Sequence, residues 1–432
     1  MATLILAAFA GFLRPSIHGH DGVMNYAYLR SLLVDQDLDF TNDYTYYLDQ
    51  YAEWFNNEPL KRDPETGRPI NLYGVGSSLL WTPFVLIAHG FCFFAANPHF
   101  PANGYSRPYE WAVGIGSAFY ASLGLWLLYR TLGRLTGRRN AFWAVLAVWL
   151  ASPLVFYIYL HPSMSHANAF FLASLALWLY SRSDSLANWS VLGAVVGLLV
   201  STRFQDASLL LGIAAGELWR LRSQALRCAA GGVKGRLMRY AAATVVAVVA
   251  FVPQLFAWHA LQGTAFSGPR AYLNQGNVNP LAPVHLMEVL FSPRHGLFYW
   301  HPILILGAVG LLLPARNKWL QVAALGAFTG ELWIISSWSV WWAGASFGQR
   351  MFISALPFLG IGISIALQSR KALAQFILQC LIVLMVLWNF GYIVQYGAGL
   401  ISRQDGVPLK TLISNNLIAV PKLFLKRLNG SN

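Results

Sequence analysis

Long apolar runs separated by short polar breaks dominate the chain. Most runs hold roughly 15 to 24 residues, the length that a helix needs to cross a ~30 Å hydrocarbon core. The runs lie near residues 1–13, 74–97, 110–130, 141–160, 166–181, 189–202, 206–220, 240–260, 297–314, 318–338, 351–369 and 373–396. The pattern predicts an all-α polytopic membrane protein, with residues 1–432 forming a single membrane-embedded domain.

Composition supports the membrane class. Of the 432 residues, 56% are hydrophobic and only 11% are charged, whereas soluble domains carry about a quarter charged residues. The three cysteines lie far apart, in or beside apolar runs, and form no CxxC motif. Neither a disulfide framework nor a thiolate metal site is therefore expected.

Basic residues fix the expected orientation. Half of the thirty lysines and arginines lie in five short connections, at residues 130–139, 182, 220–239, 316–318 and 370–371. The positive-inside rule places all five on the cytoplasmic side, and they fall there together only if segment 74–97 does not cross. Because Gly74, Gly76 and Pro83 interrupt that segment, we expect an interfacial helix or a re-entrant hairpin.

About eleven transmembrane helices result, with the amino terminus inside and the carboxyl terminus outside. The first run, residues 1–13, is interpreted as a retained helix because it has no basic n-region and no cleavage motif follows it. Topology then accounts for the net charge of +13. Nucleic acid is excluded as a partner.

The first outer segment, residues 14–109, is long and acidic. Together with Glu110 it holds eleven of the seventeen acidic residues. His20 and Asp21 follow the first helix directly, which places a carboxylate at the membrane surface. The spacing of Tyr26 and the leucines after it, with Arg30 on the opposite side, predicts a helix parallel to the membrane.

Further outer turns each carry a histidine or an arginine. These candidates are His161 and His166, Arg203 with Asp206, Arg270, Arg294 with His295, and Arg350. Ionisable groups near hydrocarbon are costly and mark functional sites by default. Arginine forks bind phosphate oxygens, and a carboxylate can deprotonate a hydroxyl nucleophile. The set indicates group transfer from an anionic, sugar-bearing lipid at the outer leaflet.

The arrangement resembles the glycosyltransferase C superfamily, which includes protein O-mannosyltransferases and the lipid A aminoarabinose transferase. The shared features are a first helix, a long outer loop that opens with an acidic motif and carries interfacial helices, and many short-looped spans. Asp21, followed by Tyr26, Tyr28 and Arg30, falls where the superfamily places its catalytic acid. The segments that look like parts of bacterial members are 21–44, 81–83, 292–302 and 341–350.

The resemblance implies a membrane glycosyltransferase of the bacterial cell envelope, either a hexosyl- or a pentosyltransferase. Its donor would be a polyprenyl-phosphate-linked sugar reached from the membrane lipids, and its acceptor a lipid, a glycan or a protein. The reaction would face the periplasm or exterior of the cytoplasmic (inner) membrane. Asp21 is the predicted catalytic residue. The predicted substrate-binding residues are His20, Tyr26, Arg30, His161, His166, Arg203, Asp206, Arg270, Arg294, His295 and Arg350.

Simpler roles compete with some of these assignments. Asp21 is also a suitable N-cap for the helix that follows it. Arg203 and Asp206 are three residues apart and could simply pair with each other. His161 and His166 could share one helix face, although Pro162 lies between them and no Glu or Cys supports a zinc site.

A divalent cation is the only cofactor that the sequence raises. Asp35, Asp37 and Asp39 alternate along the chain and could chelate such an ion. A solvated turn between two interfacial helices explains the same spacing, so the sequence leaves the metal undecided. The sequence His20-Asp21-Gly22 stands where the superfamily often has an Asp-Glu pair, which leaves a second catalytic acid open as well.

Two other function classes remain open. A flippase or transporter of lipid-linked sugars would need two related halves and broken helices near the bilayer midplane, and the sequence shows no internal repeat. A non-catalytic membrane subunit would have no cleft that joins Asp21 with Arg294 and Arg350. A serine hydrolase is disfavoured because no Gly-x-Ser-x-Gly elbow is present.

The carboxyl-terminal tail, residues 397–432, reads as an amphipathic surface segment. Apolar residues from Leu417 onward alternate with Lys422 and Lys426. Such a segment is suited to an anionic lipid surface, and its side of the membrane stays open. Pro421 argues against one continuous helix.

Overall fold

The computed structural model describes residues 2–51, 61–182, 184–225, 233–270, 273, 278–279, 281–368 and 371–428. The chain divides into two compact units. The first unit consists of residues 1–127, 157–207 and 223–277, and the second of residues 128–156, 208–222 and 278–432. In the described part of both units the regular structure is helical, apart from one isolated bridge between Arg62 and Pro69.

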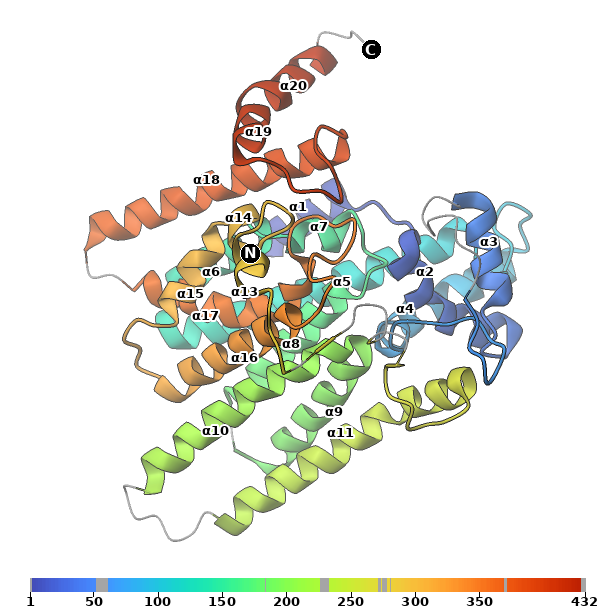
Figure 1. Cartoon of the computed structure of the whole chain (residues 1–432), viewed down its shortest axis with the longest axis horizontal. Helices are drawn as coiled ribbons and strands as arrows, with labels where there is room; N and C mark the ends of the chain where they lie inside the picture. Colours follow the sequence, from blue (N-terminus) through green and yellow to red (C-terminus); the bar gives the residue numbers. More distant parts are fainter. Residues whose placement is uncertain are drawn as a thin grey trace. The chain divides into compact units, whose positions relative to one another are not determined.

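The first unit is built around the amino-terminal helices, drawn in blue in Figure 1, and the packed pair α9 and α11. Its helices are α1 (Ala2–Phe12), α2 (Gly19–Arg30), α3 (Thr41–Tyr51), α4 (Gly76–Ala95), α5 (Arg107–Thr136), α7 (Leu154–Tyr159), α8 (His166–Tyr180), α9 (Leu186–Thr202) and α11 (Val233–Gln262). The ends of α5 and α7 extend into residues of the second unit. A π-helical turn, Ser31–Asp35, follows α2, and a 3-10 turn, Phe204–Leu209, follows α9.

Helices α9 and α11 lie side by side because glycines allow their backbones to touch (Figure 1). A Cβ atom at Gly193 would lie 2.1 Å from the carbonyl oxygen of Ala243, and one at Gly197 would lie 2.3 Å from that of Ala247. Small residues four positions apart on each helix are the usual device for close helix packing in membranes. The pair therefore forms a rigid wall of the first unit.

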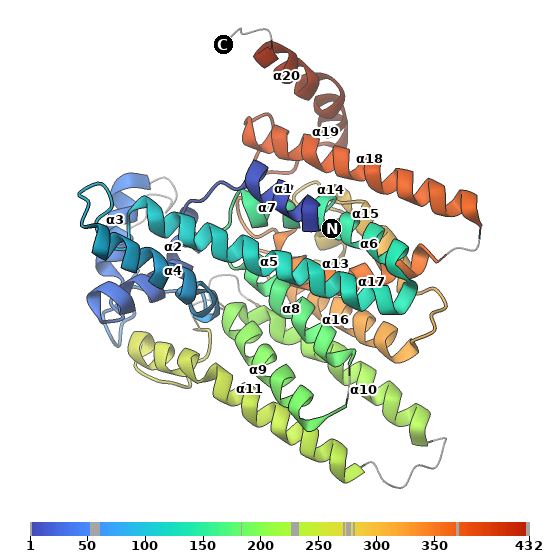
Figure 2. The same ribbon diagram turned by 180° about the vertical axis from the view of Figure 1, so that it is seen from behind.

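An aromatic core joins α2, α3 and α4. Tyr26, Tyr28, Phe40, Tyr44 and Trp81 are at most 2% exposed and belong to one hydrophobic cluster. Figure 2 shows α4 beside the first half of α5, where a Cβ atom at Gly116 would touch the rings of Phe84 and Trp81. The core packs residues 17–48 against α4 and α5.

The second unit consists mainly of the carboxyl-terminal half of the chain. Its helices are α6 (Arg138–Leu150), α10 (Leu210–Ala225), α13 (Leu286–Phe291), α14 (Leu297–Trp300), α15 (Ile303–Gly310), α16 (Lys318–Ser336), α17 (Leu356–Ala366), α18 (Ala372–Gly397), α19 (Leu409–Ser414) and α20 (Val420–Leu428). Helices α15 and α17 pack through glycines, since a Cβ atom at Gly310 would lie 1.9 Å from the carbonyl oxygen of Gly362.

Five helices of the described part are long and apolar enough to cross a membrane. They are Gly76–Ala95, Arg107–Thr136, Lys234–Gln262, Lys318–Ser336 and Ala372–Gly397. The chain is thus a multi-pass helical protein, while the total of eleven crossings stays a prediction. Several predicted spans are interrupted: 141–160 breaks after Leu150, and 297–314 breaks at His301 and Pro302.

Segment 74–97 forms one continuous helix, α4, so the re-entrant hairpin is wrong. Gly74 lies before this helix and Gly76 begins it, and Pro83 is accommodated inside its 20 residues. Two placements of α4 remain: the predicted helix at the membrane interface, and a full crossing, for which the helix is long and apolar enough.

The helix expected after residue 18 forms, but it is buried in the protein and not amphipathic, while its orientation along the membrane stays a prediction. Every residue of α2 from Gly22 to Arg30 is buried, so the helix has no solvent-facing polar side. Arg30 tolerates burial because Asp35 and Asp43 lie beside it, and Asn25 donates to the carbonyl oxygen of Asp21 at 2.7 Å. Leu32, expected on the apolar side, is 55% exposed.

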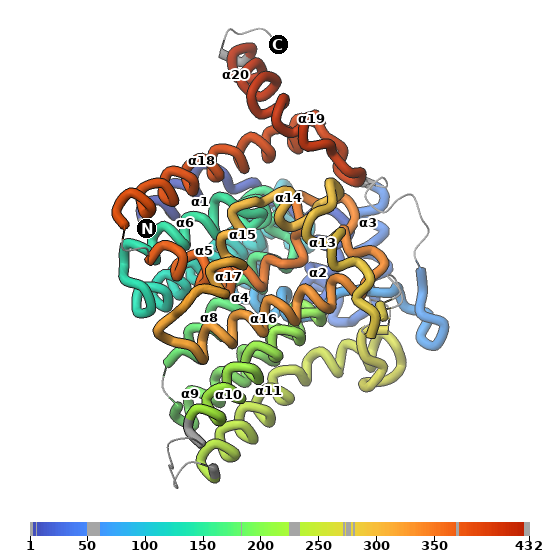
Figure 3. The backbone as a smooth tube through the Cα atoms, turned by 60° about the vertical axis from the view of Figure 1, so that its left-hand side comes forward, coloured from blue at the N-terminus to red at the C-terminus, as the bar shows by residue number. Residues whose placement is uncertain are grey.

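The tail is helical through Pro421, contrary to expectation. A π-helical turn, Asn415–Ala419, joins α19 to α20, and the wider turn accommodates a residue that cannot donate to the helical ladder. Figure 3 shows α19 and α20 leaving the end of α18 at an angle. Phe424 and Leu425 are more than half exposed, as an amphipathic surface segment requires.

Candidate functional site

Asp21 lies in the first turn of α2, in the first unit. The residue is half-buried, and its Oδ1 accepts a hydrogen bond from the hydroxyl of Tyr73 at 2.6 Å. The N-cap position belongs to His18, so Asp21 is not the cap of this helix. The positive end of the helix dipole still favours a negative charge at this point.

Tyr73 is held in place by two other groups. Asn71 donates from its side-chain amide to the carbonyl oxygen of Met24 at 2.9 Å and accepts the backbone N–H of Tyr73 at 2.9 Å. The hydroxyl of Tyr28 donates to the carbonyl oxygen of Tyr73 at 2.9 Å. The ring of half-buried His20 stands edge-on to Tyr73, with the centroids 6.3 Å apart. The hydroxyl that meets Asp21 is thus fixed from both sides.

The loop between α7 and α8 approaches α2 at a glycine. A Cβ atom at Gly22 would lie 2.4 Å from the Oγ of Ser163, so only glycine permits this contact. Ser163 is 1% exposed, and its hydroxyl has no hydrogen-bond partner among the described residues. The contact brings the 161–166 loop next to Asp21.

Two histidines meet at this loop. The Nε2 atoms of His18 and His161 are 3.4 Å apart, and the rings stand edge to face with centroids 4.3 Å apart. Burial lowers the pKa of His18 to about 4, so its imidazole carries no charge at neutral pH. One ring can then donate to the other without charge repulsion.

Arg203 supplies a cation on the other side of the loop. Its Nη1 donates to the Nδ1 of His166 at 2.9 Å and lies 3.4 Å from the Oγ of Ser165. Asp206 Oδ1 lies 3.7 Å from Nε, and both side chains are at most 9% exposed. Arg203 therefore pairs with Asp206 and also contacts His166. Because the His166 Nδ1 accepts from Arg203, a neutral His166 carries its proton on Nε2.

The segment from Tyr73 to Gly76, called the strap below, packs against α9 and α11. Cβ atoms at Gly74 and Gly76 would lie 2.1 Å from the carbonyl oxygen of Ser201 and 2.2 Å from the Oγ1 of Thr202. The backbone N–H of Val75 donates to Oε1 of Gln254, a fully buried residue of α11, at 2.9 Å. Tyr73 and Arg203 are consequently positioned by one set of close contacts.

Tyr26 and Arg30 lie farther along α2 and have structural partners. Tyr26 donates to the carbonyl oxygen of Gly104 at 2.9 Å. Arg30 pairs with Asp35 and Asp43, and its guanidinium lies 4.2 Å from the ring centre of Tyr105. Their predicted role in substrate binding stays a prediction.

A second cluster, in the second unit, contains three other predicted residues. The guanidinium of Arg294 lies 3.8 Å from the ring centre of Trp342. His295 Nδ1 donates to the carbonyl oxygen of Trp342 at 2.9 Å, and Arg350 Nη2 donates to that of Ala343 at 3.0 Å. Burial, followed by the nearby arginines, lowers the pKa of His295 to about 4.

The backbone of this second cluster is strained. His295 and Ala343 have φ of 61° and 60°, a conformation that side chains disfavour and that occurs preferentially at functional sites. Ser346 joins the two turns, with its Oγ 3.0 Å from His295 Nδ1. The predicted residue Arg270 lies elsewhere, on an exposed segment of the first unit.

No group of three His, Cys, Asp or Glu side chains in the described ranges is arranged to hold a metal ion. The carboxylates at the proposed cation position have other partners. Asp35 binds Arg30 and Asn42, Asp37 accepts from Ser31, and Asp39 accepts from Thr41. These partners make a turn the better interpretation of the Asp-x-Asp-x-Asp spacing.

Several residues of the first cluster were not predicted from the sequence. Tyr73 contacts Asp21 and His18 contacts His161. Asn71 positions Tyr73, and Ser163 meets α2 at Gly22. The glycines of Tyr73-Gly74-Val75-Gly76 were interpreted only as helix interruptions. Two glycines separated by one residue at the start of a helix also indicate that another backbone approaches closely. That signal predicts the contact of the strap with α9.

We expect the substitution Gly22→Ala to destabilise the protein. The new methyl group would collide with Ser163, and overpacking of this kind costs about 1–3 kcal/mol. Thermal unfolding in detergent should show a lower Tm, and adding Ser163→Gly should restore it. Gly90→Ala is the control, because nothing lies within 4 Å of that position. Failure of Ser163→Gly to rescue would contradict the contact.

Asp43 should make stability depend on pH. Burial raises its pKa from 3.8 to about 7, although Arg30 opposes the shift. The folded state therefore binds the proton more tightly than the unfolded state, and this stabilisation, complete below about pH 4, is lost as the pH rises through about 7.

Asp43→Asn should flatten the fall of Tm between about pH 5 and about pH 8. Asp49→Asn, on the exposed side of the same helix α3, should leave the slope unchanged. Equal slopes for wild type and Asp43→Asn in thermal unfolding scans would show that Asp43 does not titrate in this range.

Comparison with known proteins identifies the fold. No protein-family model and no curated protein sequence matches the chain. ArnT from Cupriavidus metallidurans bound to undecaprenyl phosphate is similar in structure, with a TM-score of 0.54 at 14% identity over 98% of this chain and 74% of that one. Its apo state gives a TM-score of 0.53 at 13% identity, over the same shares of the two chains.

A third similar structure is the Archaeoglobus fulgidus oligosaccharyltransferase in complex with Zn and sulfate. Its TM-score is 0.52 at 13% identity, over 94% of this chain and 53% of that one. At identities of 13–14%, the similarity concerns only the course of the backbone. The chain therefore has the fold that these structures share, which is the fold expected from its resemblance to the glycosyltransferase C superfamily.

Proposed function

We propose that the protein is a membrane glycosyltransferase that moves a sugar from a polyprenyl phosphate donor to a lipid, glycan or protein acceptor. The reaction takes place at the outer face of the cytoplasmic membrane. The observation that carries the proposal is the position of Asp21, half-buried in the first turn of α2 and held by the Tyr73 hydroxyl. ArnT, which has the same fold, was solved with undecaprenyl phosphate bound, and this supports the choice of donor.

Asp21 acts as the general base in this proposal. A carboxylate has about four lone-pair positions, so the bond from Tyr73 leaves capacity for an acceptor hydroxyl. The acceptor oxygen attacks the anomeric carbon as its proton passes to Asp21, and the bond between that carbon and the phosphate oxygen breaks with its electron pair. The products are the glycosylated acceptor and the polyprenyl phosphate.

Tyr73 and the helix end keep Asp21 ready for this role. The hydroxyl of Tyr73 orients the carboxylate, and the amino-terminal end of α2 stabilises its charge. His20 lies beside the same tyrosine and is proposed to contact substrate. None of these groups needs to move for the carboxylate to accept a proton.

The leaving phosphate needs positive charge, not a covalent intermediate. In the first unit Arg203 is the cation of the cluster, and its contact with His166 orients the guanidinium. In the second unit Arg294 and Arg350 remain the predicted phosphate ligands, along with His295. The half-buried positions of the two arginines and the strained turns beside them support this prediction.

Asp21→Asn tests the base directly. We expect transfer from a radiolabelled undecaprenyl-phosphate sugar, in membranes that contain the protein and its acceptors, to fall at least about 100-fold. The Tm should stay near that of wild type because an amide oxygen can still accept from Tyr73. Asp49→Asn is the matched control on an exposed carboxylate. Undiminished turnover by Asp21→Asn would reject the assignment.

A further inference from the structure

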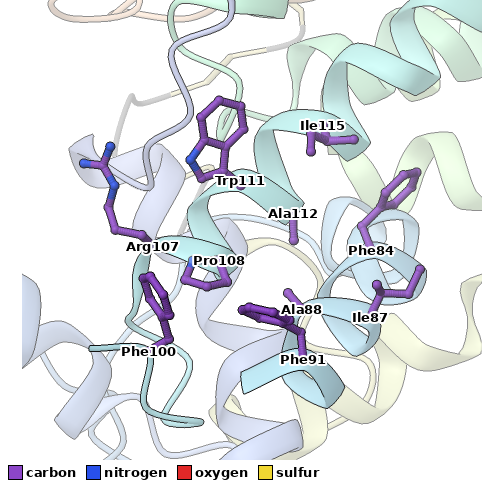
Figure 4. Close-up of a pocket in the computed structure, with 10 residues that line it drawn as sticks. All are labelled: Phe84, Ile87, Ala88, Phe91, Phe100, Arg107, Pro108, Trp111, Ala112 and Ile115. Atoms are coloured by element: carbon purple, nitrogen blue, oxygen red, sulfur yellow. The ribbon is translucent and has the colours of Figure 1, made fainter. Parts of the chain in front are cut away.

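An open apolar groove lies between α4 and the first turns of α5, within the first unit. Its volume is about 710 Å³, inside the ~300–1,000 Å³ range of small-molecule sites. The walls include Phe84, Ile87 and Phe91 of α4, with Phe100, Trp111 and Ile115 facing them (Figure 4). No residue of the Asp21 cluster lines it.

The groove uses the face of α4 that the core leaves open. Ser77, Ser78 and Trp81 on the buried face are at most 4% exposed, and Ser78 donates to the carbonyl oxygen of Asn25. On the groove face, Ile87 is 74% and Phe91 is 55% exposed. A groove of this kind in the hydrocarbon region is expected to hold an apolar group, because empty space would leave its side chains without dispersion contacts.

The length of the groove fits one hydrocarbon chain of one leaflet. Its lining on α5 runs from Arg107 to Ile115, nine residues whose eight steps correspond to about 12 Å at 1.5 Å per residue. Half of the ~30 Å hydrocarbon core is about 15 Å. An acyl chain that enters from a single leaflet therefore matches the groove from end to end.

A cation marks one end of the groove. Figure 4 shows the guanidinium of Arg107 turned away from the apolar side chains, at the end of the lining. The side chain of Arg107 is 74% exposed, and its Nε lies 3.9 Å from Oε2 of Glu110. An exposed ion pair of this length contributes little to stability. The guanidinium of Arg107 can therefore also bind phosphate oxygens.

We infer that this groove binds an acyl chain of an anionic phospholipid whose phosphate pairs with Arg107. The inference does not depend on sugar transfer. A bilayer phospholipid is the proposed occupant because a chain of one-leaflet length matches the lining.

The bound lipid would support α4 and α5, which are hydrogen-bonded to the 161–166 loop of the Asp21 cluster. Trp81 of α4 donates to Ser117 of α5 at 2.8 Å, and Ser117 donates to the carbonyl oxygen of Pro162 at 2.6 Å. Pro162 belongs to the loop that contacts Gly22. Filling the groove holds α4 and α5 at the spacing on which this chain of bonds depends.

Native mass spectrometry of the full-length protein in detergent tests the inference. With added phosphatidylglycerol, wild type should retain one lipid adduct more strongly than with phosphatidylcholine. Arg107→Gln should weaken phosphatidylglycerol retention about fivefold. Arg138→Gln, an exposed arginine at the start of α6, should leave it unchanged.

Ala88→Phe should abolish the adduct by filling the groove, whereas Leu86→Phe adds bulk on α4 outside the lining and should not. If Ala88→Phe does not fold, Ile115→Trp blocks the same space from α5. Equal retention in Arg107→Gln and wild type would overturn the inference, as would an adduct that survives both filling variants. Displacement of the adduct by undecaprenyl phosphate would also overturn it, because the groove would then belong to the donor.

Discussion

Close contacts at three glycines determine the arrangement of the first unit. Gly22 allows α2 to contact Ser163. Gly74 and Gly76 allow the strap, which precedes and begins α4, to contact the end of α9. Each contact is too short for a Cβ atom, so the geometry depends on the absence of a side chain. Asp21, Tyr73 and Arg203 are brought to the same region because the segments that carry them are in backbone contact.

The chemistry of this region follows from unequal environments. Asp21 lies at the positive end of a helix and accepts from Tyr73, conditions that favour a carboxylate. His18, in contrast, is kept neutral by burial, and Arg203 stays charged beside Asp206 and His166. A carboxylate, a neutral imidazole and a guanidinium are groups that suit the proposed transfer from a lipid phosphate.

The sequence predicted the membrane class and the fold, while the catalytic role of the segment after the first helix stays a prediction. Asp21 is proposed because it follows the first helix directly, where the resemblance places an acid, and the pairing of Arg203 with Asp206 follows from their spacing. Tyr73 and Gln254 could not be identified, because their partners lie 52 and 179 residues away along the chain. Helix breaks in the predicted spans escaped detection because hydropathy reports burial in lipid, not the continuity of the hydrogen-bond ladder.

The central claim is that Asp21 faces the reacting end of a lipid-phosphate sugar. An experimental structure with a non-hydrolysable polyprenyl-phosphate sugar analogue bound tests it most directly. The account predicts the sugar–phosphate linkage beside the amino-terminal turn of α2, with room for an acceptor hydroxyl within ~3 Å of the Asp21 carboxylate. A lipid head group bound elsewhere, with Asp21 facing only bulk water, would contradict it.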